Sequence, residues 1–338
     1  MIKVFFASSE SSNKFGVNQV ILHLKKFLSK NCTFFNPGSF LNFFKNEYDL
    51  VHIHGCWKLN ILFFFILSKF KKIKVIISPH GMLDPNSLKQ KKILKLLAWH
   101  VYQKYIFLFS NLIIVNSIKE KKNILKILRH KNIKVIPHGI VIDSRFNKKN
   151  NRKKNTKLKF VFFSRIHPSK NLMQLINIWT ANIFFKKFNL SIYGEISDFK
   201  YFENLKNKIK KFNNIKYKGS LYKNKIQKLS KHDVFIFPSL SENFGLVILE
   251  ALASGLYLIL NSSLPWNHLS KKGFATLINF KEKTLIKEIL RLEKIKNRIR
   301  GPKYVIKTNS YLVDNYSWKE ISKKYVSCYL EVLKKTKI

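Results

Sequence analysis

Two glutamates eight residues apart are the most informative polar residues of the sequence. Glu242 and Glu250 lie in the stretch PSLSENFGLVILEALASG, which runs from Pro238 to Gly255 after a short apolar run. The pattern predicts a helix from near Gly245 to Gly255, with Glu242 at its start, where the helix dipole favours a carboxylate. Glu250 lies among apolar residues, so its charge needs partners such as the two hydroxyls of a ligand diol. The structural alternative is that Glu242 caps the helix and Glu250 pairs with a donor of the core.

Two cations five residues apart form the second cluster. Arg165 and Lys170 lie in FSRIHPSKN, between an apolar run and a helical stretch that begins near Leu172. Fixed positive charges beside a helix N-terminus favour a diphosphate, because the charges and the backbone N–H groups act together. The alternative is an ordinary solvated surface, since Lys and Arg occur throughout this chain.

Three histidines, each followed by a glycine, form the third cluster. His54, His80 and His138 each follow a predicted strand. The ends of parallel strands gather ligands, and the glycines allow tight turns there. A single histidine of this kind is more often structural, but three at equivalent positions indicate a ligand site lined with imidazoles.

Together the clusters resemble the retaining GT-B glycosyltransferases of family 4, and the resemblance runs from Met1 to the C-terminal helix. The E-x7-E element corresponds to Glu242 and Glu250, and the R-x4-K element to Arg165 and Lys170. The phrases DLVHIHG, ISPHGMLDP, VIPHGI and LPW follow in the family's order. The resemblance implies an α/β GT-B fold, with two Rossmann-like domains whose parallel sheets face each other across a cleft. It also implies sugar transfer with retention from a UDP- or GDP-sugar to a glycan or lipid-linked acceptor, in cell-surface polysaccharide or lipopolysaccharide biosynthesis.

The resemblance further implies a role for each matching donor-side residue. Arg165 and Lys170 would bind the donor diphosphate and stabilise the leaving group, and Glu250 would hold the ribose hydroxyls. Glu242 would contact the donor sugar as a catalytic residue. The backbone N–H groups beside it belong to Asn243, Phe244 and Gly245.

On the acceptor side, the resemblance makes His80 a second catalytic residue, beside the sugar and the acceptor. Gly16 would lie in a loop near phosphate and acceptor, but its motif NKFG lacks the family's usual paired glycines. Ser164 and Asn171 replace common glycines around the R-x4-K element, and His138 stands where the family more often has asparagine. None of these departures removes a charged donor contact.

The rest of the sequence must supply the elements that position these residues. Short apolar runs alternate with stretches of helical period, and several runs are continuous, as in strands buried on both faces of a parallel sheet. Helices are predicted over residues 18–29 and 87–109, and after a capping Ser317. The predicted strands are residues 3–7, 49–53, 74–78, 111–115 and 134–136, then 159–163, 190–193, 215–217, 234–237 and 257–260.

The length of 338 residues favours two domains. Residues 1–145, joined by a C-terminal helix 315–338 that crosses back, are predicted to form the acceptor-side domain. Residues 157–314 are predicted to form the nucleotide-sugar donor domain. The segment 146–156 is polar and cationic, which is typical of a linker, and a nucleic-acid-binding arm is the alternative.

The chain carries 64 Lys and Arg against 18 Asp and Glu, a net charge of +46. Such a charge attracts polyanions and anionic membranes, whether it was selected for or arose by compositional drift. Cys32, Cys56 and Cys328 are far apart in the sequence, which suits a reducing compartment. The most apolar run, residues 59–67, is too short to span a bilayer. We expect a cytoplasmic protein that contacts the inner face of the membrane peripherally.

The sequence also bears on cofactors and on other classes of protein. Its six aspartates are isolated and form no D-x-D, so we expect transfer without a metal or other cofactor, with cations acting on the leaving group. No G-x-G-x-x-G occurs, which disfavours a nicotinamide dehydrogenase. The sequence has no zinc module or aromatic–basic RNA signature, so no specific nucleic-acid partner is expected. A nucleotide-sugar epimerase and a catalytically silent partner on the same scaffold stay open as alternatives.

Overall fold

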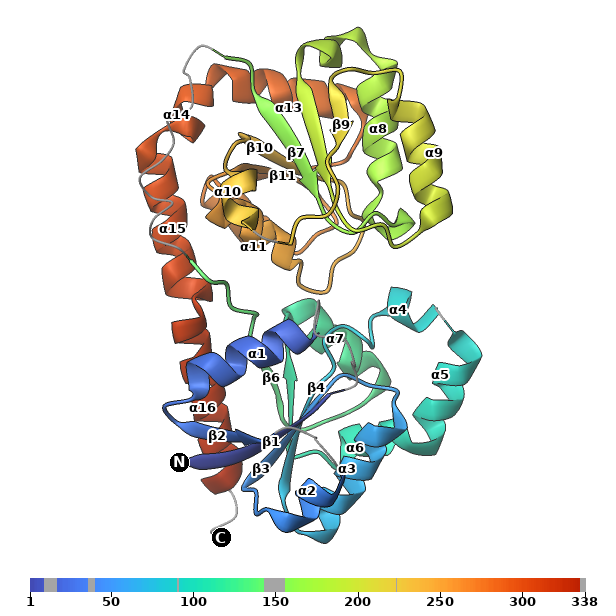
Figure 1. Cartoon of the computed structure of the whole chain (residues 1–338), viewed down its shortest axis with the longest axis vertical. Coiled ribbons are helices and arrows are strands. Elements are labelled where there is room, and N and C mark those ends of the chain that lie inside the picture. The colour runs from blue at the N-terminus through green and yellow to red at the C-terminus, as the bar shows by residue number, and fades with distance from the viewer. Residues whose placement is uncertain (9–16, 36–39, 90, 143–155, 223, 335–338) are drawn as a thin grey trace. The chain divides into compact units, whose positions relative to one another are not determined.

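The chain divides into two compact units. The first comprises Met1–Gly139 with Asn315–Ile338, and the second comprises Ile140–Asp314. Each unit is built on a six-stranded sheet with helices packed against it (Figure 1). The structure is a computed structural model, and it describes residues 1–8, 17–35, 40–89, 91–142, 156–222 and 224–334. Gly16 and the predicted linker 146–156, except Thr156, lie outside the described residues.

The first sheet has the strand order β2-β1-β3-β4-β5-β6, and its neighbouring strands run parallel. Its inner strands are buried on both faces, as in LVHIH of β3, where all five residues are buried. The strands are β1 (Ile2–Ser8), β2 (Cys32–Phe35), β3 (Leu50–His54), β4 (Lys74–Ser78), β5 (Leu112–Val115) and β6 (Ile133–Val135).

Helices bury their apolar faces against both sides of this sheet. One hydrophobic cluster includes Phe64 and Ile106, and the other includes Leu24 of α1 together with Tyr325 and Tyr329 of α16. The C-terminal helix therefore packs on the N-terminal unit. The helices are α1 (Val17–Leu28), α2 (Phe40–Lys45), α3 (Leu59–Phe70), α4 (Pro85–Lys89), α5 (Lys92–Ala98), the π-helical η1 (Trp99–Gln103), α6 (Lys104–Leu108), α7 (Ile118–Ile127) and α16 (Trp318–Lys334).

The second sheet has the order β12-β11-β10-β7-β8-β9 and is also parallel. Its strands are β7 (Lys159–Phe163), β8 (Asn189–Tyr193), β9 (Ile215–Tyr217), β10 (Val234–Phe237), β11 (Tyr257–Asn261) and β12 (Ala275–Ile278). Its helices are η3 (Pro168–Lys170), α8 (Leu172–Ala181), η4 (Ile183–Lys187), α9 (Phe199–Ile209), α10 (Lys225–Leu229), α11 (Leu246–Ala253), α12 (Asn267–Lys271), α13 (Glu282–Lys294), α14 (Lys296–Arg300) and α15 (Pro302–Tyr316).

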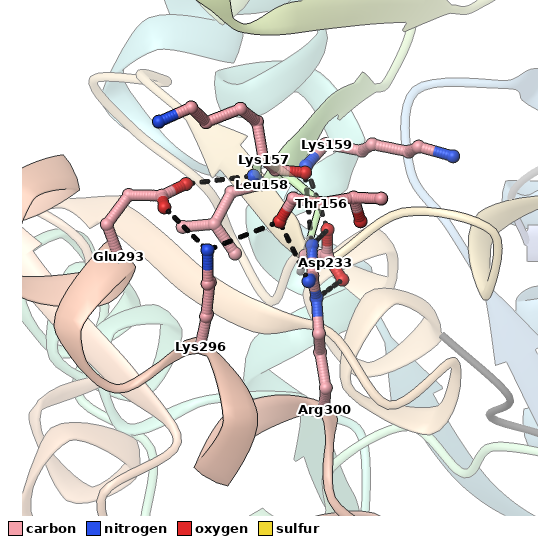
Figure 2. A network of polar contacts seen from close by, with 8 residues as sticks. All are labelled: Thr156, Lys157, Leu158, Lys159, Asp233, Glu293, Lys296 and Arg300. Carbon is pink, nitrogen blue, oxygen red and sulfur yellow. Dashed lines mark hydrogen bonds and ion pairs between the residues drawn. The ribbon is translucent and has the colours of Figure 1, made fainter. Parts of the chain in front are cut away.

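A buried ion pair joins the segment before β7 to α14 within the second unit (Figure 2). Arg300 Nε and Nη2 donate to the two carboxylate oxygens of Asp233 at 2.9 and 2.8 Å. The same guanidinium donates to the backbone carbonyls of Thr156 and Lys157 at 3.0 Å each. The N–H of Lys159 donates to Asp233 at 2.8 Å. Since these groups satisfy both buried charges, the network joins β7 and β10 to α14.

The predicted α/β fold with two Rossmann-like domains is confirmed. Each predicted strand is present to within one residue at either end, whereas β2 and β12 were missed. The helix predicted over residues 87–109 is divided, because Lys91 adopts the left-handed conformation with φ 50°. Ser317 caps α16 as predicted, and its Oγ accepts from the Glu320 N–H at 3.3 Å.

Within the described ranges, the chain forms no helix that has both the length and the apolar character needed to cross a bilayer.

Candidate functional site

The E-x7-E element lies at the carboxyl edge of the second sheet. A loop follows β10, and α11 then carries the second glutamate. Gly245 precedes the helix with φ 84°, a left-handed conformation that glycine adopts without strain. Phe244 is buried and contacts the ring of Trp266 at a centroid distance of 5.5 Å. The glycine and the aromatic contact together fix the loop that carries Glu242.

Glu242 and Lys170, one residue from each predicted motif, form an ion pair. Lys170 Nζ lies 2.6 Å from Glu242 Oε1, and each side chain is 11% exposed. Ser239 Oγ donates to the same oxygen at 2.8 Å. Glu242 Oε2 makes no hydrogen bond with another described residue. An ammonium has three donors, so Lys170 can hold Glu242 and still donate to an anionic oxygen.

Glu250 differs from its sequence-based description as a carboxylate without a charged neighbour. Lys225 Nζ of α10 lies 2.8 Å from Glu250 Oε1, and the glutamate side chain is 21% exposed. The ammonium also lies 5.7 Å from the ring centroid of Phe163, the last residue of β7. Glu250 Oε2 has no hydrogen-bond partner in the part of the chain that the structure describes. Glu250 therefore has a protein partner, although Lys225 is 30% exposed and is not a donor of the core, and α11 has no side-chain cap from Glu242. One oxygen of Glu250 still has room for a ligand donor.

Arg165 follows β7 and is exposed, and it makes no hydrogen bond or ion pair with another described residue. The loop that carries it is held by a close backbone contact. A Cβ placed on Gly194 would lie 1.8 Å from the carbonyl oxygen of Ser164, so only glycine fits beside this loop. The guanidinium is thus a freely accessible cation on a fixed backbone.

Asn171, which departs from the family's pattern, has a structural reason. Its φ is 55°, in the left-handed region where glycine is favoured and asparagine is the best-tolerated substitute. Its side chain bonds Gln174 and donates to the carbonyl of Pro238 at 3.4 Å. The substitution therefore preserves the turn between Lys170 and α8.

In the first unit, histidines stack at the carboxyl edge of the sheet. The rings of His54 and His80 lie 5.2 Å apart at 14°, and those of His80 and His138 lie 5.6 Å apart at 9°. Burial, followed by repulsion from neighbouring imidazoles, lowers the pKa of His52, His54 and His80 well below its ordinary value. Burial also lowers the pKa of His138 to about 4. The stack is therefore neutral at pH 7.

Both ring nitrogens of His80 are engaged within the unit. Nε2 lies 2.9 Å from His54 Nδ1, and Nδ1 lies 3.2 Å from Asn116 Nδ2. If the amide donates to Nδ1, the hydrogen of His80 is on Nε2 and points to His54. His80 also has φ 51°, which is uncommon for a residue other than glycine. Sequence reasoning predicted a catalytic His80, and the structure holds this ring firmly by both nitrogens.

Glu120 is a buried carboxylate that sequence reasoning missed. It accepts from the backbone N–H groups of Gly81 and Asn116, the latter at 2.7 Å. Its own N–H donates to Ser117 Oγ at 3.1 Å. The S-x-x-E pattern of residues 117–120 is a capping-box signal that predicts the bond to Ser117 Oγ, whereas the carboxylate bonds Asn116 and Gly81 in place of the Ser117 N–H. Glu120 thus fixes the turn that carries His80.

The predicted donor-side residues come together at one edge of the second sheet. Lys170, Glu242 and Ser239 are in contact, and Asn243, Phe244 and Gly245 follow in the same loop. Arg165 follows the end of β7, and Glu250 lies in the middle of α11. His80 belongs to the first unit. Chemically, the edge of the second unit offers cations for phosphate and two open carboxylate oxygens for hydroxyl groups.

Two family models match adjoining parts of the chain. The model described as Glycosyltransferase Family 4 matches residues 6–144, and the model described as Glycosyl transferases group 1 matches residues 143–300. A Klebsiella pneumoniae protein, described as an uncharacterized 41.2 kDa protein in the cps region, is 28% identical over 260 residues, which cover 72% of this chain and 69% of that protein.

Solved structures share the fold over nearly the whole chain. HepE of Anabaena in complex with UDP and glucose is 17% identical, with a TM-score of 0.73 over 98% of this chain and 100% of HepE. A glycosyltransferase of Rickettsia africae is 16% identical, with a TM-score of 0.73 over 98% and 99%. WaaG, a glycosyltransferase involved in lipopolysaccharide biosynthesis, is 12% identical, with a TM-score of 0.65 over 97% and 99%. Together, the two family models and the shared fold identify this chain as a two-domain glycosyltransferase of the GT-B type.

Proposed function

We propose that this glycosyltransferase moves a sugar, with retention, from a UDP- or GDP-sugar to a glycan or lipid-linked acceptor. The observation that carries the proposal is the contact between Lys170 and Glu242, which are 72 residues apart in the sequence. It brings the R-x4-K and E-x7-E elements to one site at the carboxyl edge of a parallel sheet, where such sheets bind ligands.

The contacts support a division of labour at the donor. Arg165, exposed and unpaired among the described residues, meets the diphosphate, and the remaining N–H donors of Lys170 reach the same group. These fixed cations stabilise the negative charge that develops on the leaving diphosphate. Glu242 Oε2 accepts from a sugar hydroxyl, and Glu250 Oε2 accepts from the ribose hydroxyls. In each carboxylate a lysine holds the other oxygen.

The remaining roles rest on the family resemblance. His80 lies beside the sugar and acceptor, and the neutral stack keeps its orientation fixed. Gly16 takes part in the acceptor and phosphate loop. The leaving group departs without a metal, because cationic side chains carry the electrostatic task.

The nature of the relatives supports a donor class and a pathway class. HepE is solved with UDP and with UDP-glucose, which favours a uridine nucleotide as the first donor to test. WaaG acts in lipopolysaccharide biosynthesis, and the Klebsiella relative is described as lying in a cps region. We therefore place the chain in the synthesis of a cell-surface polysaccharide or lipopolysaccharide, on the cytoplasmic side and in peripheral contact with the membrane, as the net charge of +46 favours.

The test is a thermal-shift screen of UDP- and GDP-sugars, followed by product analysis with the best donor. A ligand at a hundredfold excess over its Kd adds about 2.7 kcal/mol of stability. NMR of the product gives the anomeric configuration, and assays with chelator test the metal-free reaction. Folded Arg165→Ala and Glu250→Ala variants that process the donor as fast as the parent would overturn the proposal. Donor isomerised without any acceptor would indicate an epimerase instead.

A further inference from the structure

A helical segment of the first unit exposes a continuous series of large apolar side chains. α5, η1 and α6 follow one another over residues 92–108, and α5 has no buried residue at all. Ile93 is 75% exposed, Leu94 65% and Val101 72%. In Figure 1, α5 lies at the margin of its unit, away from the sheet. The segment is thus attached to the core through only part of its length.

Five of the exposed residues share one side of the helical segment. Leu94, Leu97, Val101, Tyr105 and Leu108 recur at spacings of three and four, which places them along one stripe. The opposite side is buried in the core through Tyr102, Ile106 and Phe107.

The stripe continues onto a neighbouring helix. Lys69 Nζ of α3 donates to the carbonyl of Phe109 at 2.5 Å, so the ends of α3 and α6 adjoin. Phe109 is 61% exposed and Phe70 is 82% exposed. Contiguous apolar residues exposed on a monomer mark an interaction site.

The charged residues of the segment that carries the stripe all have one sign. Residues 85–119 contain no aspartate or glutamate. Lys89, Lys91 and Lys92 are exposed and make no ion pair with any residue that the structure describes. The methylene groups of such lysines can pack against the apolar side chains while the ammonium groups reach into water.

These charges discriminate between the possible occupants. A second copy of the chain would bring lysine against lysine, at a net charge of +46 on each copy. An anionic lipid surface instead takes up the leucines at the headgroup–acyl boundary and neutralises the lysines. We infer that residues 92–109, with Phe70, are the membrane-docking surface of this protein, and that an anionic phospholipid bilayer is its partner.

The docked segment lies in the plane of the interface. Its apolar stripe enters the headgroup–acyl boundary, and its buried side stays packed on the first sheet. The inference rests on the proposed peripheral location and gives it a defined contact surface. It does not depend on the identity of the donor.

Vesicle flotation tests the surface directly. The full chain should float with vesicles of phosphatidylcholine and phosphatidylglycerol, float poorly with phosphatidylcholine alone, and dissociate as salt rises. Leu94→Ser with Leu97→Ser should weaken binding by at least about tenfold, because two leucines no longer enter the lipid. The matched control, Ile183→Ser with Phe199→Ser, removes two equally exposed apolar residues from the second unit and should bind like the parent.

A charge-matched pair separates local contact from general attraction. Lys91→Glu with Lys92→Glu should weaken flotation several-fold more than Lys208→Glu with Lys211→Glu, although both change the net charge equally. All three native cysteines are buried, so an environment-sensitive dye on Val101→Cys reports from this position alone. Its emission should shift to the blue on anionic vesicles, whereas a dye on Ile183→Cys should not respond.

Each other outcome overturns the assignment in a distinct way. Equal flotation of the leucine variant and the parent would show that residues 92–109 are not the docking surface, although the protein would still bind the membrane. A parent that never floats would refute both. Self-association that is lost in the leucine variant would identify a second copy as the occupant. UDP-sugar binding, measured on the same variants, should be unchanged, so a failure of the glycosyltransferase proposal would be seen separately.

Discussion

At the scale of single residues, the two glutamates of the donor site share one design. A lysine and a serine hold Oε1 of Glu242, and Lys225 holds Oε1 of Glu250, while the second oxygen of each is open. A carboxylate fixed in this way loses little conformational freedom when a hydroxyl group binds.

Glu242→Gln should separate nucleotide binding from transfer. Removing the carboxylate frees Lys170 for the diphosphate, so UDP should bind equally well or up to about fivefold more tightly, a change of about 1 kcal/mol. Transfer should fall by about a hundredfold, since the sugar loses a charged acceptor. Calorimetry with UDP and single-turnover kinetics measure the two effects. Glu203→Gln on α9, which makes the same change of charge, should alter neither, and a loss of UDP binding in Glu242→Gln would contradict the assigned role.

Lys225→Met should reduce the recognition of ribose. Without the ammonium, Glu250 is no longer held, and UDP should bind several-fold more weakly, by about 1 kcal/mol. The preference for UDP over its 2′-deoxy analogue should also shrink. Titration of both nucleotides measures this, with the exposed Lys228→Met of the same helix as control. An unchanged preference would show that Lys225 does not act through Glu250.

The sequence predicted these glutamates but not their partners. Glu242, Glu250, Arg165 and Lys170 stand in local phrases of fixed spacing, which a single sequence displays. Lys225 is one lysine among many, and only tertiary folding brings α10 to Glu250. The hydrogen bond between His54 and His80 likewise depends on the pairing of β3 with β4.

At the scale of secondary-structure elements, the ends of β7 and β8 control where Arg165 lies. Gly194 follows β8 and touches the carbonyl of Ser164, which leaves no space for a side chain. The N–H of Ser164 also donates to the carbonyl of Tyr193 at 3.1 Å. The ends of β7 and β8 are therefore held in a fixed position relative to each other.

Gly194→Ala should damage both stability and donor binding. The added methyl group meets backbone rather than a flexible side chain, so we expect a loss of at least about 2 kcal/mol and a displaced Arg165. UDP affinity should fall by about tenfold or more. Gly273→Ala is the control, because its φ of 79° costs about 1 kcal/mol but its Cβ would meet nothing within 4 Å. Thermal unfolding and UDP titration distinguish the two, and equal UDP affinities would refute the link.

Element prediction failed where a strand or helix has few local signals. β2 and β12 are four-residue strands at the outer edges of the sheets, and two of the four residues of β12 are only partly buried. The inner strands were found because apolar runs mark burial on both faces, and the short edge strands β6 and β9 were also predicted. The break at Lys91 was missed because lysine normally favours helix.

At the scale of the whole molecule, the buried histidines make the first unit sensitive to acid. An unfolded chain protonates histidine near its ordinary pKa of about 6.5, whereas the folded unit holds these rings neutral to lower pH. Their contribution is complete above about pH 7 and is lost as the pH falls. For His138, with a pKa of about 4, the loss between pH 7 and pH 5 is on the order of 2 kcal/mol.

Hydrogen exchange of β3 and β4 at pH 7 and pH 5 measures this loss in the first unit. Between pH 7 and pH 5, His138→Asn should lose less hydrogen-exchange protection than the parent loses, because the imidazole of residue 138 is no longer there to titrate. The exposed His100→Asn is the control and should behave like the parent. Equal acid sensitivity of His138→Asn and the parent would exclude the stack as its cause.

The contact of Arg300 with Thr156 has a consequence for how such enzymes are assembled. Thr156, shortly before β7, and Arg300, the last residue of α14, are joined by a 3.0 Å hydrogen bond, and Asp233 beside β10 forms an ion pair with Arg300. The two ends of the segment 156–300 therefore adjoin in space. A segment exchanged between homologous genes must nevertheless also include α15 as far as Asp314, because Tyr304 donates to the carbonyls of Leu256 and Phe274 in the same unit.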